Sequence, residues 1–399
     1  MPPPVPPSGA PLLIDLRRTE DARDVVHRAV QALAEGRPVA FPTETDYVVA
    51  SSARVAAAAD VLRAIAGDRP GEPRLSLALK SAEETLDWAP RISPVGRRLA
   101  RRCWPGPVAM IVPDDHPESL VTRLPAVTRA ALVAGGRLRL RIPGHPLLAD
   151  CMRMLAGPVM IAEPATATAT GSVVTAEQIV AAAGGMLAMV LDDGPARYAQ
   201  PASTIELVGD GFRVVRPGIV SEETLRRLSS LMVLFVCTGN TCRSPMAEAL
   251  FRKVVAERLG CGPEEIDQRG VVVTSAGLAA WAGGPASSGA LEAVAEMGGD
   301  LRGHSSQPLT ESLVRQADVI LTMTASHRAA LLAQFPEAGD RVAMLSPDRR
   351  DVIDPIGGSL DTYRSCARQI REHLAARIAT LDLPPAGPPG PGGGPSSSD

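Results

Sequence analysis

Apolar and polar positions between residues 20 and 220 follow two periods, which indicates a mixture of helices and strands. Segments with apolar side chains every three or four residues are typical of one buried helix face, and short apolar or alternating runs are typical of strands. The helical segments are 22–35, 54–66, 94–103, 147–155 and 176–182, and the strand segments are 38–42, 75–79, 108–112, 138–142, 158–162, 189–191 and 203–207. We therefore expect a mixed α/β domain, which the segment 212–218 closes.

The pattern after residue 231 alternates more regularly between the two periods. Strands are expected at 233–236, 271–274, 319–323 and 342–345, and helices at 245–258, 286–297, 310–316, 326–333 and 359–380. Such strand–helix alternation favours a parallel sheet with helices on both faces. In sheets of this kind, ligands bind at the carboxyl ends of the strands.

A chain of 399 residues is too long for one ordinary domain, so two domains are expected. The proline-rich residues 1–11 and the Pro/Gly/Ser-rich residues 383–399 are expected to be disordered. Between them, residues 12–220 form the first domain, 221–230 a short helix or linker, and 231–382 the second domain.

Composition restricts the partners and the compartment. Hydrophobic residues make up 45% of the chain and aromatic residues only 3%, so the cores must be aliphatic. A net charge of −3 gives no overall signal for nucleic acid or membrane binding. The six cysteines are scattered, no apolar run is long enough to span a bilayer, and the proline-rich start is unlike a signal peptide. We therefore expect a cytoplasmic protein without a membrane anchor.

One segment carries a recognisable chemistry. The apolar run 233–236 ends at Cys237, a glycine-containing loop leads to Arg243, and Ser244-Pro245 is a good helix start. Loop N–H groups and a helix N-terminus together favour a bound anion, and a cysteine beside them is held as a thiolate. This arrangement suits covalent phosphoryl transfer, with the cysteine attacking while the arginine and the amides hold the phosphoryl oxygens.

An acidic residue that could complete this site lies much later in the chain. Asp354 precedes a proline and a glycine-rich loop in the segment 352–359. A fixed carboxyl group of this kind can act as a general acid. Considered alone, the same Asp-Pro pair is typical of an ordinary turn.

These motifs together resemble the low-molecular-weight protein-tyrosine-phosphatase family. The resemblance covers about residues 231–382 and continues, in order, through Ser275-Ala-Gly277, His304-Ser-Ser, Pro308-Leu-Thr310, Ala317-Asp-Val-Ile-Leu-Thr-Met323 and Asp354-Pro-Ile-Gly-Gly-Ser359. It implies a flavodoxin-like three-layer α/β fold and the hydrolysis of phosphoproteins without a metal or another cofactor.

The resemblance also implies a role for each matching residue. Cys237 would form a phosphocysteine, and Asp354 would protonate the leaving group and then activate water. Asn240 would shape the loop and Ser244 would stabilise the thiolate. The phosphate would be bound by Arg243 and the loop amides, with Thr238, Gly239, Asn240, Thr241 and Cys242 forming the loop. Cys242 is either a reversible disulfide partner of Cys237 or an inert loop residue.

Two residues bear on the substrate. Thr241 stands where tyrosine phosphatases of this family usually carry an aliphatic residue, and the run from Cys237 to Ser244 resembles the bacterial protein-arginine-phosphatase branch. A hydroxyl group there can hydrogen-bond to a guanidinium. Ile356 and its neighbours also offer no aromatic ring to flank a tyrosine. We therefore expect phosphoarginine to be favoured, with phosphotyrosine as the alternative if Thr241 is neutral packing.

The first domain resembles the YrdC-like family, which includes threonylcarbamoyl-AMP synthases of tRNA modification. The resemblance covers about residues 20–220, implies a twisted mixed sheet around a basic concave surface, and rests on Phe41-Pro-Thr-Glu-Thr45, Trp104-Pro-Gly-Pro107, Arg141 with His145-Pro146, Ser203-Thr-Ile205 and Arg216-Pro-Gly218. It makes Thr43, Arg69, Arg141, Ser203 and Arg216 the candidate nucleotide or RNA site.

This domain departs from the family pattern where ATP would bind. The family's lysine before Arg69 is missing, with only Lys80 nearby, Val48 replaces a glycine, and Glu163 stands where the family has a serine/asparagine motif. A glutamate repels a triphosphate. We expect a degenerate domain that binds a nucleotide, a partner, or tRNA or double-stranded RNA. The alternative is an active synthase that uses ATP with Mg²⁺. Arginines 69, 101, 102, 137, 139 and 141 would line a basic groove or simply be solvated.

Overall fold

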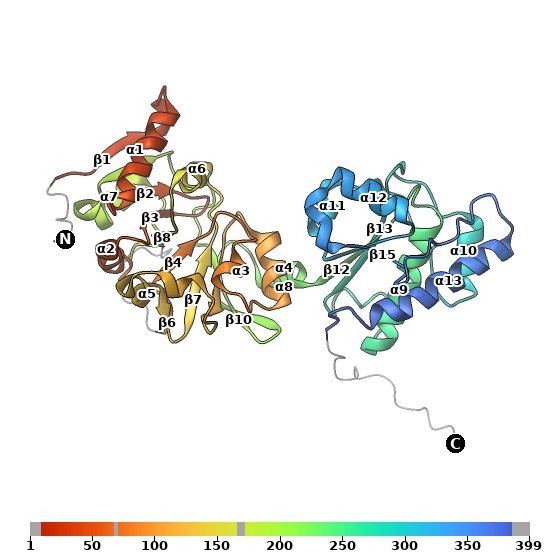
Figure 1. Cartoon of the computed structure of the whole chain (residues 1–399). Coiled ribbons are helices and arrows are strands. Elements are labelled where there is room, and N and C mark those ends of the chain that lie inside the picture. Colours follow the sequence, from red (N-terminus) through yellow and green to blue (C-terminus); the bar gives the residue numbers. More distant parts are fainter. Residues whose placement is uncertain (1–8, 68–70, 166–171, 385–399) are drawn as a thin grey trace, which may run out of the picture. The chain divides into compact units, whose positions relative to one another are not determined.

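The computed structural model describes residues 9–67, 71–165 and 172–384. The chain forms two compact units, Met1–Leu228 and Ser229–Asp399, which are considered separately below (Figure 1). The expectation of disorder for residues 1–8 and 385–399 lies outside the described residues, as does the candidate Arg69.

The first unit is built on one large mixed sheet. Among the described residues the strand order is β1-β9-β2-β3-β8-β4-β7-β5-β10-β11, with β6 paired to β7. The strands are β1 Leu12–Asp15, β2 Val39–Pro42, β3 Tyr47–Ser52, β4 Leu75–Ala78, β5 Val108–Pro113, β6 Val133–Ala134, β7 Arg137–Arg141, β8 Val159–Ala162, β9 Met189–Asp192, β10 Ser203–Val208 and β11 Gly211–Arg216.

Helices cover both faces of this sheet and bury two apolar clusters. They are α1 Ala22–Ala34, α2 Ala56–Ala66, α3 Thr85–Trp88, α4 Pro94–Cys103, α5 Ala126–Leu132, α6 Pro146–Met154, α7 Ala176–Ala183 and α8 Glu222–Ser229, with short 3-10 turns at Leu16–Arg18, Leu120–Arg123 and Gly184–Met186. Local sequence explains their starts: the Asp21 side chain caps α1, and Ser93 caps α4 just before Pro94. The segment 221–230 is thus largely the helix α8, whose Leu225 is fully buried in the first unit's core.

The second unit is a parallel sheet between two helical layers, as Figure 1 shows. Its strands are β12 Leu231–Cys237, β13 Val271–Gly277, β14 Val319–Thr322 and β15 Val342–Met344, in the order β13-β12-β14-β15. All seven residues of β12 are buried, as a central parallel strand requires.

The helices of the second unit form two separate apolar clusters with the sheet. Those on one face are α9 Arg243–Leu259, α10 Ser288–Ala295 and α13 Leu360–Ile378. Those on the other are α11 Glu311–Gln316 and α12 Ala325–Gln334, followed by a 3-10 turn at Pro336–Arg341. Helix α9 ends at Gly260, whose left-handed conformation (φ 67°) suits a residue without a side chain.

The predicted fold class is confirmed for both units: a mixed α/β sheet, then a three-layer fold with a parallel sheet. The sequence pattern missed β1, β3, β6, β11 as a separate strand, α3 and α5. Strand β3 was missed because it follows β2 closely and is buried throughout. In the part of the chain that the structure describes, no helix is long and apolar enough to cross a bilayer.

Candidate active site

The candidate catalytic cysteine lies at the carboxyl end of the central strand of the second sheet. Cys237 is the last residue of β12, which lies between β13 and β14. The strand order reverses at this point, which is where open α/β sheets bind ligands. Residues 238–242 form the loop, and α9 begins at Arg243 without a side-chain cap. The N–H groups of its first turn therefore have no side-chain acceptor, as an anion site needs.

Asn240 holds this loop in shape. Its backbone is left-handed (φ 56°), a conformation that asparagine tolerates better than most residues. Its side-chain Nδ2 donates to the hydroxyls of Ser244 at 3.0 Å and Ser275 at 2.8 Å, and its Oδ1 accepts from the Gln307 backbone N–H at 2.9 Å. The His304 ring donates to the Asn240 carbonyl at 2.8 Å. Asn240 is fully buried, so these bonds fix the loop.

The sulfur of Cys237 faces groups that suit a thiolate. The Asn240 backbone N–H donates to it at 3.2 Å, and the Ser244 hydroxyl lies 2.9 Å away. Cys237 is only 3% exposed, so its sulfur is surrounded by the loop and is shielded from bulk solvent. These contacts agree with the role expected for Ser244.

The candidate phosphate-binding arginine and the candidate general acid are in direct contact. Arg243 Nη2 donates to Asp354 Oδ2 at 2.6 Å. The arginine side chain is 8% exposed and the aspartate side chain is 46% exposed. The structure therefore brings together two residues that are 111 positions apart in the chain.

A histidine that the sequence did not single out supports the other end of the loop. His327 Nε2, on α12, lies 2.8 Å from the Thr238 hydroxyl. Burial lowers the pKa of His327, and the positive charge of Arg243 lowers it further, while Asp354 and Asp351 act in the opposite direction. The ring is thus favoured in its neutral form. Nothing in the sequence around 327 indicated this contact.

The remaining loop residues lie at the rim. Thr241 is partly exposed, and its carbonyl accepts from the Ser287 N–H at 2.9 Å. Ile356 is 71% exposed, which leaves it free to contact a substrate. The Cys242 sulfur lies 3.3 Å from the Ser287 hydroxyl and 3.8 Å from the Tyr363 hydroxyl. A disulfide between Cys242 and Cys237 remains a prediction.

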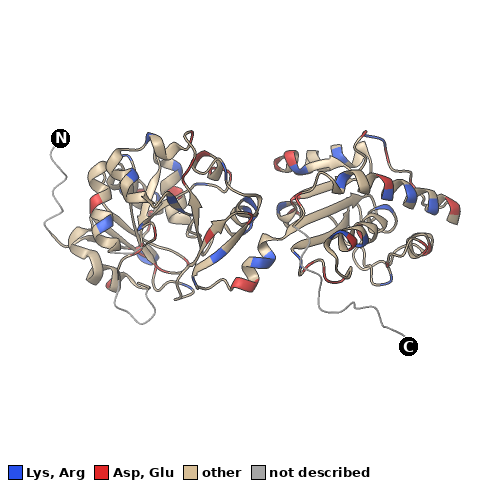
Figure 2. Cartoon of the chain, turned by 90° about the horizontal axis from the view of Figure 1, so that it is seen from below, with Lys and Arg blue, Asp and Glu red and all other residues tan. Residues whose placement is uncertain are grey.

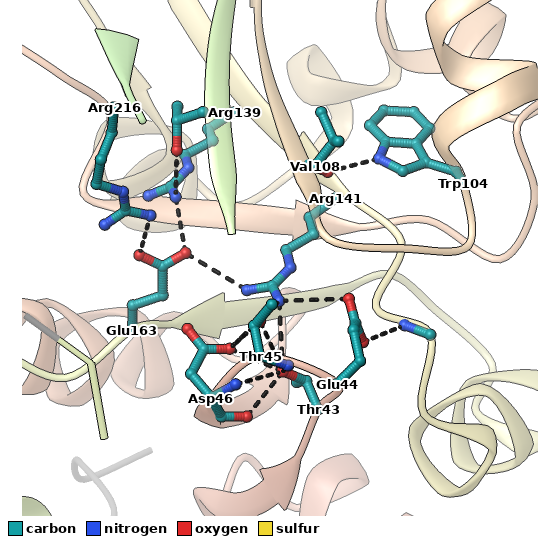
Figure 3. A network of polar contacts seen from close by, with 12 residues as sticks. Thr43, Glu44, Thr45, Asp46, Trp104, Val108, Arg139, Arg141, Glu163 and Arg216 are labelled. Carbon is teal, nitrogen blue, oxygen red and sulfur yellow. Dashed lines mark hydrogen bonds and ion pairs between the residues drawn. The ribbon is translucent and has the colours of Figure 1, made fainter. Parts of the chain in front are cut away.

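The candidate site of the first unit is a buried ion cluster, drawn in Figure 3. Glu163 follows β8, and its Oε1 accepts from Arg139 Nη2 at 2.7 Å and from Arg141 Nη1 at 3.5 Å. Its Oε2 accepts from Arg216 Nη2 at 2.7 Å. Arg139 and Arg141 are 1% and 0% exposed. The expectation that these two arginines line a basic groove or are solvated is therefore wrong, because the carboxylate neutralises them inside the protein.

Arg141 has further acidic partners in the loop between β2 and β3. Its Nη2 lies 2.7 Å from the Thr45 hydroxyl, 3.2 Å from Asp46 Oδ1 and 3.7 Å from Glu44 Oε1. Burial alone would lower the pKa of Arg141, but the carboxylates of Asp46, Glu44 and Glu163 raise it above its ordinary value. Thr43 joins the same cluster by donating to Asp46 Oδ1 at 2.7 Å.

The other predicted residues of this site are placed differently. The Ser203 hydroxyl exchanges hydrogen bonds with the backbone of Val220, donating at 2.8 Å and accepting at 3.0 Å, so it has a structural role. Lys80 follows β4 just beyond Ala78, and Ala78 pairs with Val159 at the start of β8. Glu163 follows the other end of β8, so Lys80 and Glu163 lie at opposite ends of β8. Lys80 does not replace the missing lysine.

ATP with Mg²⁺ does not fit this cluster as the structure has it. Three buried or partly buried guanidinium groups already face three carboxylates, those of Glu44, Asp46 and Glu163. A triphosphate would meet the Glu163 carboxylate where it needs positive charge. Within the described ranges, no group of three or more His, Cys, Asp or Glu side chains is placed to hold a metal ion. Figure 2 shows the positions of Lys and Arg interspersed with those of Asp and Glu along the ribbon of both units.

Comparisons with known proteins match one family model to each of the two units. Residues 232–383 match the family model described as low molecular weight phosphotyrosine protein phosphatase, and residues 31–218 match the Sua5/YciO/YrdC model, described as telomere recombination. The chain is 44% identical over 146 residues to a protein-arginine-phosphatase of Bacillus subtilis, covering 36% of this chain and 91% of the relative.

Two further relatives match the same region. A protein-arginine-phosphatase of Geobacillus stearothermophilus is 39% identical over 151 residues, covering 37% of this chain and 93% of the relative. A probable low molecular weight protein-tyrosine-phosphatase of Ralstonia solanacearum is 34% identical over 150 residues, covering 37% and 94%. The chain thus belongs to the low molecular weight phosphotyrosine protein phosphatase family, and it carries a Sua5/YciO/YrdC domain ahead of the phosphatase domain.

Proposed function

We propose that the second unit is a cysteine-dependent phosphatase that removes phosphoryl groups from arginine side chains of proteins. The observation that carries the chemistry is the contact set of Cys237: its sulfur faces the Asn240 N–H and the Ser244 hydroxyl at the carboxyl end of β12. The paired Arg243 and Asp354 supply the cation and the proton donor.

The reaction would proceed in two displacements. The Cys237 thiolate attacks phosphorus, the P–N bond breaks, and its electron pair goes to the guanidine nitrogen, which takes a proton from Asp354. Water then attacks the phosphocysteine and gives a proton to the Asp354 carboxylate. The S–P bond breaks, which releases inorganic phosphate and restores the thiolate. Arg243 and the loop amides compensate the charge on the phosphoryl oxygens in both steps.

Thr241 and the relatives support phosphoarginine over phosphotyrosine. The hydroxyl group of Thr241 can hydrogen-bond to a guanidinium, and Ile356 offers no ring to a tyrosine. The relatives from Bacillus subtilis and Geobacillus stearothermophilus, 44% and 39% identical, carry the name protein-arginine-phosphatase. We also propose that the substrates are phosphoproteins. The proposed location is the cytoplasm, a reducing compartment.

A comparison of substrates tests this proposal. We expect the full chain to hydrolyse a phosphoarginine peptide with a kcat/KM about tenfold or more above that for a phosphotyrosine peptide. An aryl phosphate serves as the generic substrate, and Cys237→Ser should lower all three rates by about 10⁴-fold or more. A preference for phosphotyrosine would contradict the substrate assignment, and full activity of Cys237→Ser would contradict the mechanism.

We also propose that the first unit no longer synthesises threonylcarbamoyl-AMP and serves as a binding module for a nucleotide, tRNA, double-stranded RNA or a partner. The supporting observation is the internal pairing of Glu163 with Arg139, Arg141 and Arg216. The full chain should release no pyrophosphate from ATP with Mg²⁺, threonine and bicarbonate. Substantial pyrophosphate release would instead identify an active synthase.

A further inference from the structure

The Glu163 carboxylate makes the contacts that a bound oxyanion would make. Its two oxygens lie on one carbon and accept from three guanidinium groups, at 2.7 Å from Arg139, 3.5 Å from Arg141 and 2.7 Å from Arg216. Guanidinium groups arranged around two oxygens are the usual protein site for a carboxylate or a phosphoryl group. Here the anion comes from the protein itself.

Two of the three arginines, Arg139 and Arg141, have hydrogen-bond partners besides Glu163. Arg139 and Arg141 are alternate residues of β7, which lies between β4 and β5, and both are buried. Arg139 also donates to the Thr204 hydroxyl at 3.2 Å, and Arg141 to Thr45 at 2.7 Å. Strand β11 places Arg216 at its end. The three cations thus come from two strands, β7 and β11, and Glu163 follows a third, β8.

The cluster retains donors beyond those that Glu163 uses. The Nε atoms of Arg141 and Arg216 are buried without a hydrogen-bond acceptor among the described residues. Burial alone would lower the pKa of Arg216, but Glu163 raises it above its ordinary value. If Glu163 lost its charge, the cluster of three cations would keep only Glu44 and Asp46 as carboxylates and would carry net positive charge.

We propose that Glu163 is a built-in anion that occupies the oxyanion site formed by Arg139, Arg141 and Arg216, and that it excludes the phosphate groups of a nucleotide from the first unit. This deepens the second proposal above, since it names the group that closes the site and the ligand class, a phosphoryl oxyanion, that the site takes once the group is removed.

Binding of inorganic pyrophosphate to the full chain tests the inference. All proteins carry Arg243→Ala, so that the phosphate loop of the second unit does not contribute. We expect calorimetry to show that pyrophosphate binds Glu163→Gln on the order of a hundredfold more tightly than this parent, because one negative charge next to the ligand has been removed. Glu206→Gln is the matched control: Glu206 also pairs with two arginines, Arg137 and Arg213, outside this cluster.

Three results would overturn the inference: equal binding by the parent, no gain in a folded Glu163→Gln protein, or an equal gain in Glu206→Gln. If Glu163→Gln melts at a lower temperature than the parent, pyrophosphate should raise its melting temperature and leave that of the parent unchanged. Absence of this rescue would also overturn it. The outcome is separate from synthase activity. Pyrophosphate release by the unaltered chain would contradict the second proposal. Equally tight pyrophosphate binding by the parent without such release would contradict only this inference.

Discussion

Arg243 Nη2 lies 2.6 Å from Asp354 Oδ2, so the proposed phosphate-binding cation and the proposed general acid are in direct contact. A phosphoryl group that enters the loop must compete with Asp354 for the guanidinium. The aspartate side chain is 46% exposed and the arginine side chain only 8%, so the aspartate is the partner with room to move. We therefore expect an entering phosphoryl group to displace the Asp354 carboxylate from Arg243.

Replacing Asp354 by asparagine should separate the two roles of this contact. We expect Asp354→Asn to lower kcat for phosphoarginine by about 10²–10⁴-fold, since no proton donor remains. Inorganic phosphate should inhibit at least as strongly as before, because the amide competes less well for Arg243. Steady-state kinetics and phosphate inhibition measure both effects. Asp351→Asn is the control, since Asp351 lies in the same loop but accepts from the Ala325 N–H at 2.8 Å; an equal loss of kcat there would contradict the assignment.

Asn240 should be as important for stability as for catalysis. Asn240→Ala removes the amide donor to the Ser244 and Ser275 hydroxyls and the acceptor of the Gln307 N–H, and it forces alanine into a left-handed backbone. We expect the free energy of unfolding of the second unit to fall by about 3 kcal/mol.

A glycine variant isolates the backbone part of this effect. Asn240→Gly loses the same hydrogen bonds but adopts the left-handed conformation freely. It should therefore be more stable than Asn240→Ala by roughly 1 kcal/mol. Denaturant unfolding of both variants provides the comparison. Equal stabilities would show that the positive φ of Asn240 costs nothing.

The sequence pattern predicted much of the second unit because the features that determine its strand, loop and helix start lie close together in the chain. The continuous apolar run of β12, the glycine-containing loop and the Ser-Pro helix start follow one another within 16 residues, and each has a backbone requirement that sequence reveals. Asp354 was placed in the same site as Arg243 from its Asp-Pro pair before a glycine-rich loop and from the family resemblance, but the direct contact between the two side chains was not predicted. The contact between Thr238 and His327 spans 89 positions and joins a loop to a helix, so no local pattern could indicate it.

The first unit shows how the same pattern misleads. Alternation in Arg137–Arg141 predicted a strand correctly, and such a strand usually turns its polar face to solvent. Strand β7 instead lies inside the sheet, between β4 and β5, and Glu163 neutralises the arginines from 22 and 24 positions away. The alternation of side chains along this strand could be predicted from the sequence. The carboxylate of Glu163, which pairs with its polar face, could not.

Thr241 is the residue at which we expect a substitution to change the substrate preference. Thr241→Ile removes the hydroxyl group and adds aliphatic surface at the partly exposed rim. We expect the ratio of kcat/KM for phosphoarginine over phosphotyrosine to fall by about tenfold or more, because a hydrogen bond to the guanidinium is lost. Thr241→Ser keeps the hydroxyl group and should retain the preference.

A second change at the rim can be compared with the first. Ile356→Phe adds a ring at a side chain that is 71% exposed, and it should raise kcat/KM for phosphotyrosine through contact with the substrate ring. It should leave the rate with a small aryl-free phosphoarginine substrate nearly unchanged. An unchanged ratio in Thr241→Ile would remove Thr241 from the specificity argument, whatever Ile356→Phe does.

His327 should make the second unit sensitive to acid. Burial and the charge of Arg243 lower its pKa in the folded state, so the unfolded chain takes up a proton first as the pH falls below the ordinary histidine value of about 6.5. The free energy of unfolding should therefore decrease with falling pH below that value and show no contribution from this group above it. His327→Gln keeps a polar partner for Thr238 and should make the decrease shallower, as denaturant unfolding at a series of pH values can measure.

A second buried histidine distinguishes a role in the loop from a role in stability alone. Burial also lowers the pKa of His373, on α13, whose side chain makes no hydrogen bond to the phosphate loop within the described part of the chain. Both His327→Gln and His373→Gln should flatten the acid decrease in stability. Only His327→Gln should also change the pH dependence of inhibition by inorganic phosphate, because protonated His327 can no longer accept from Thr238, which lies next to Cys237 in the loop. If the two variants change phosphate inhibition equally, His327 serves the fold and not the loop.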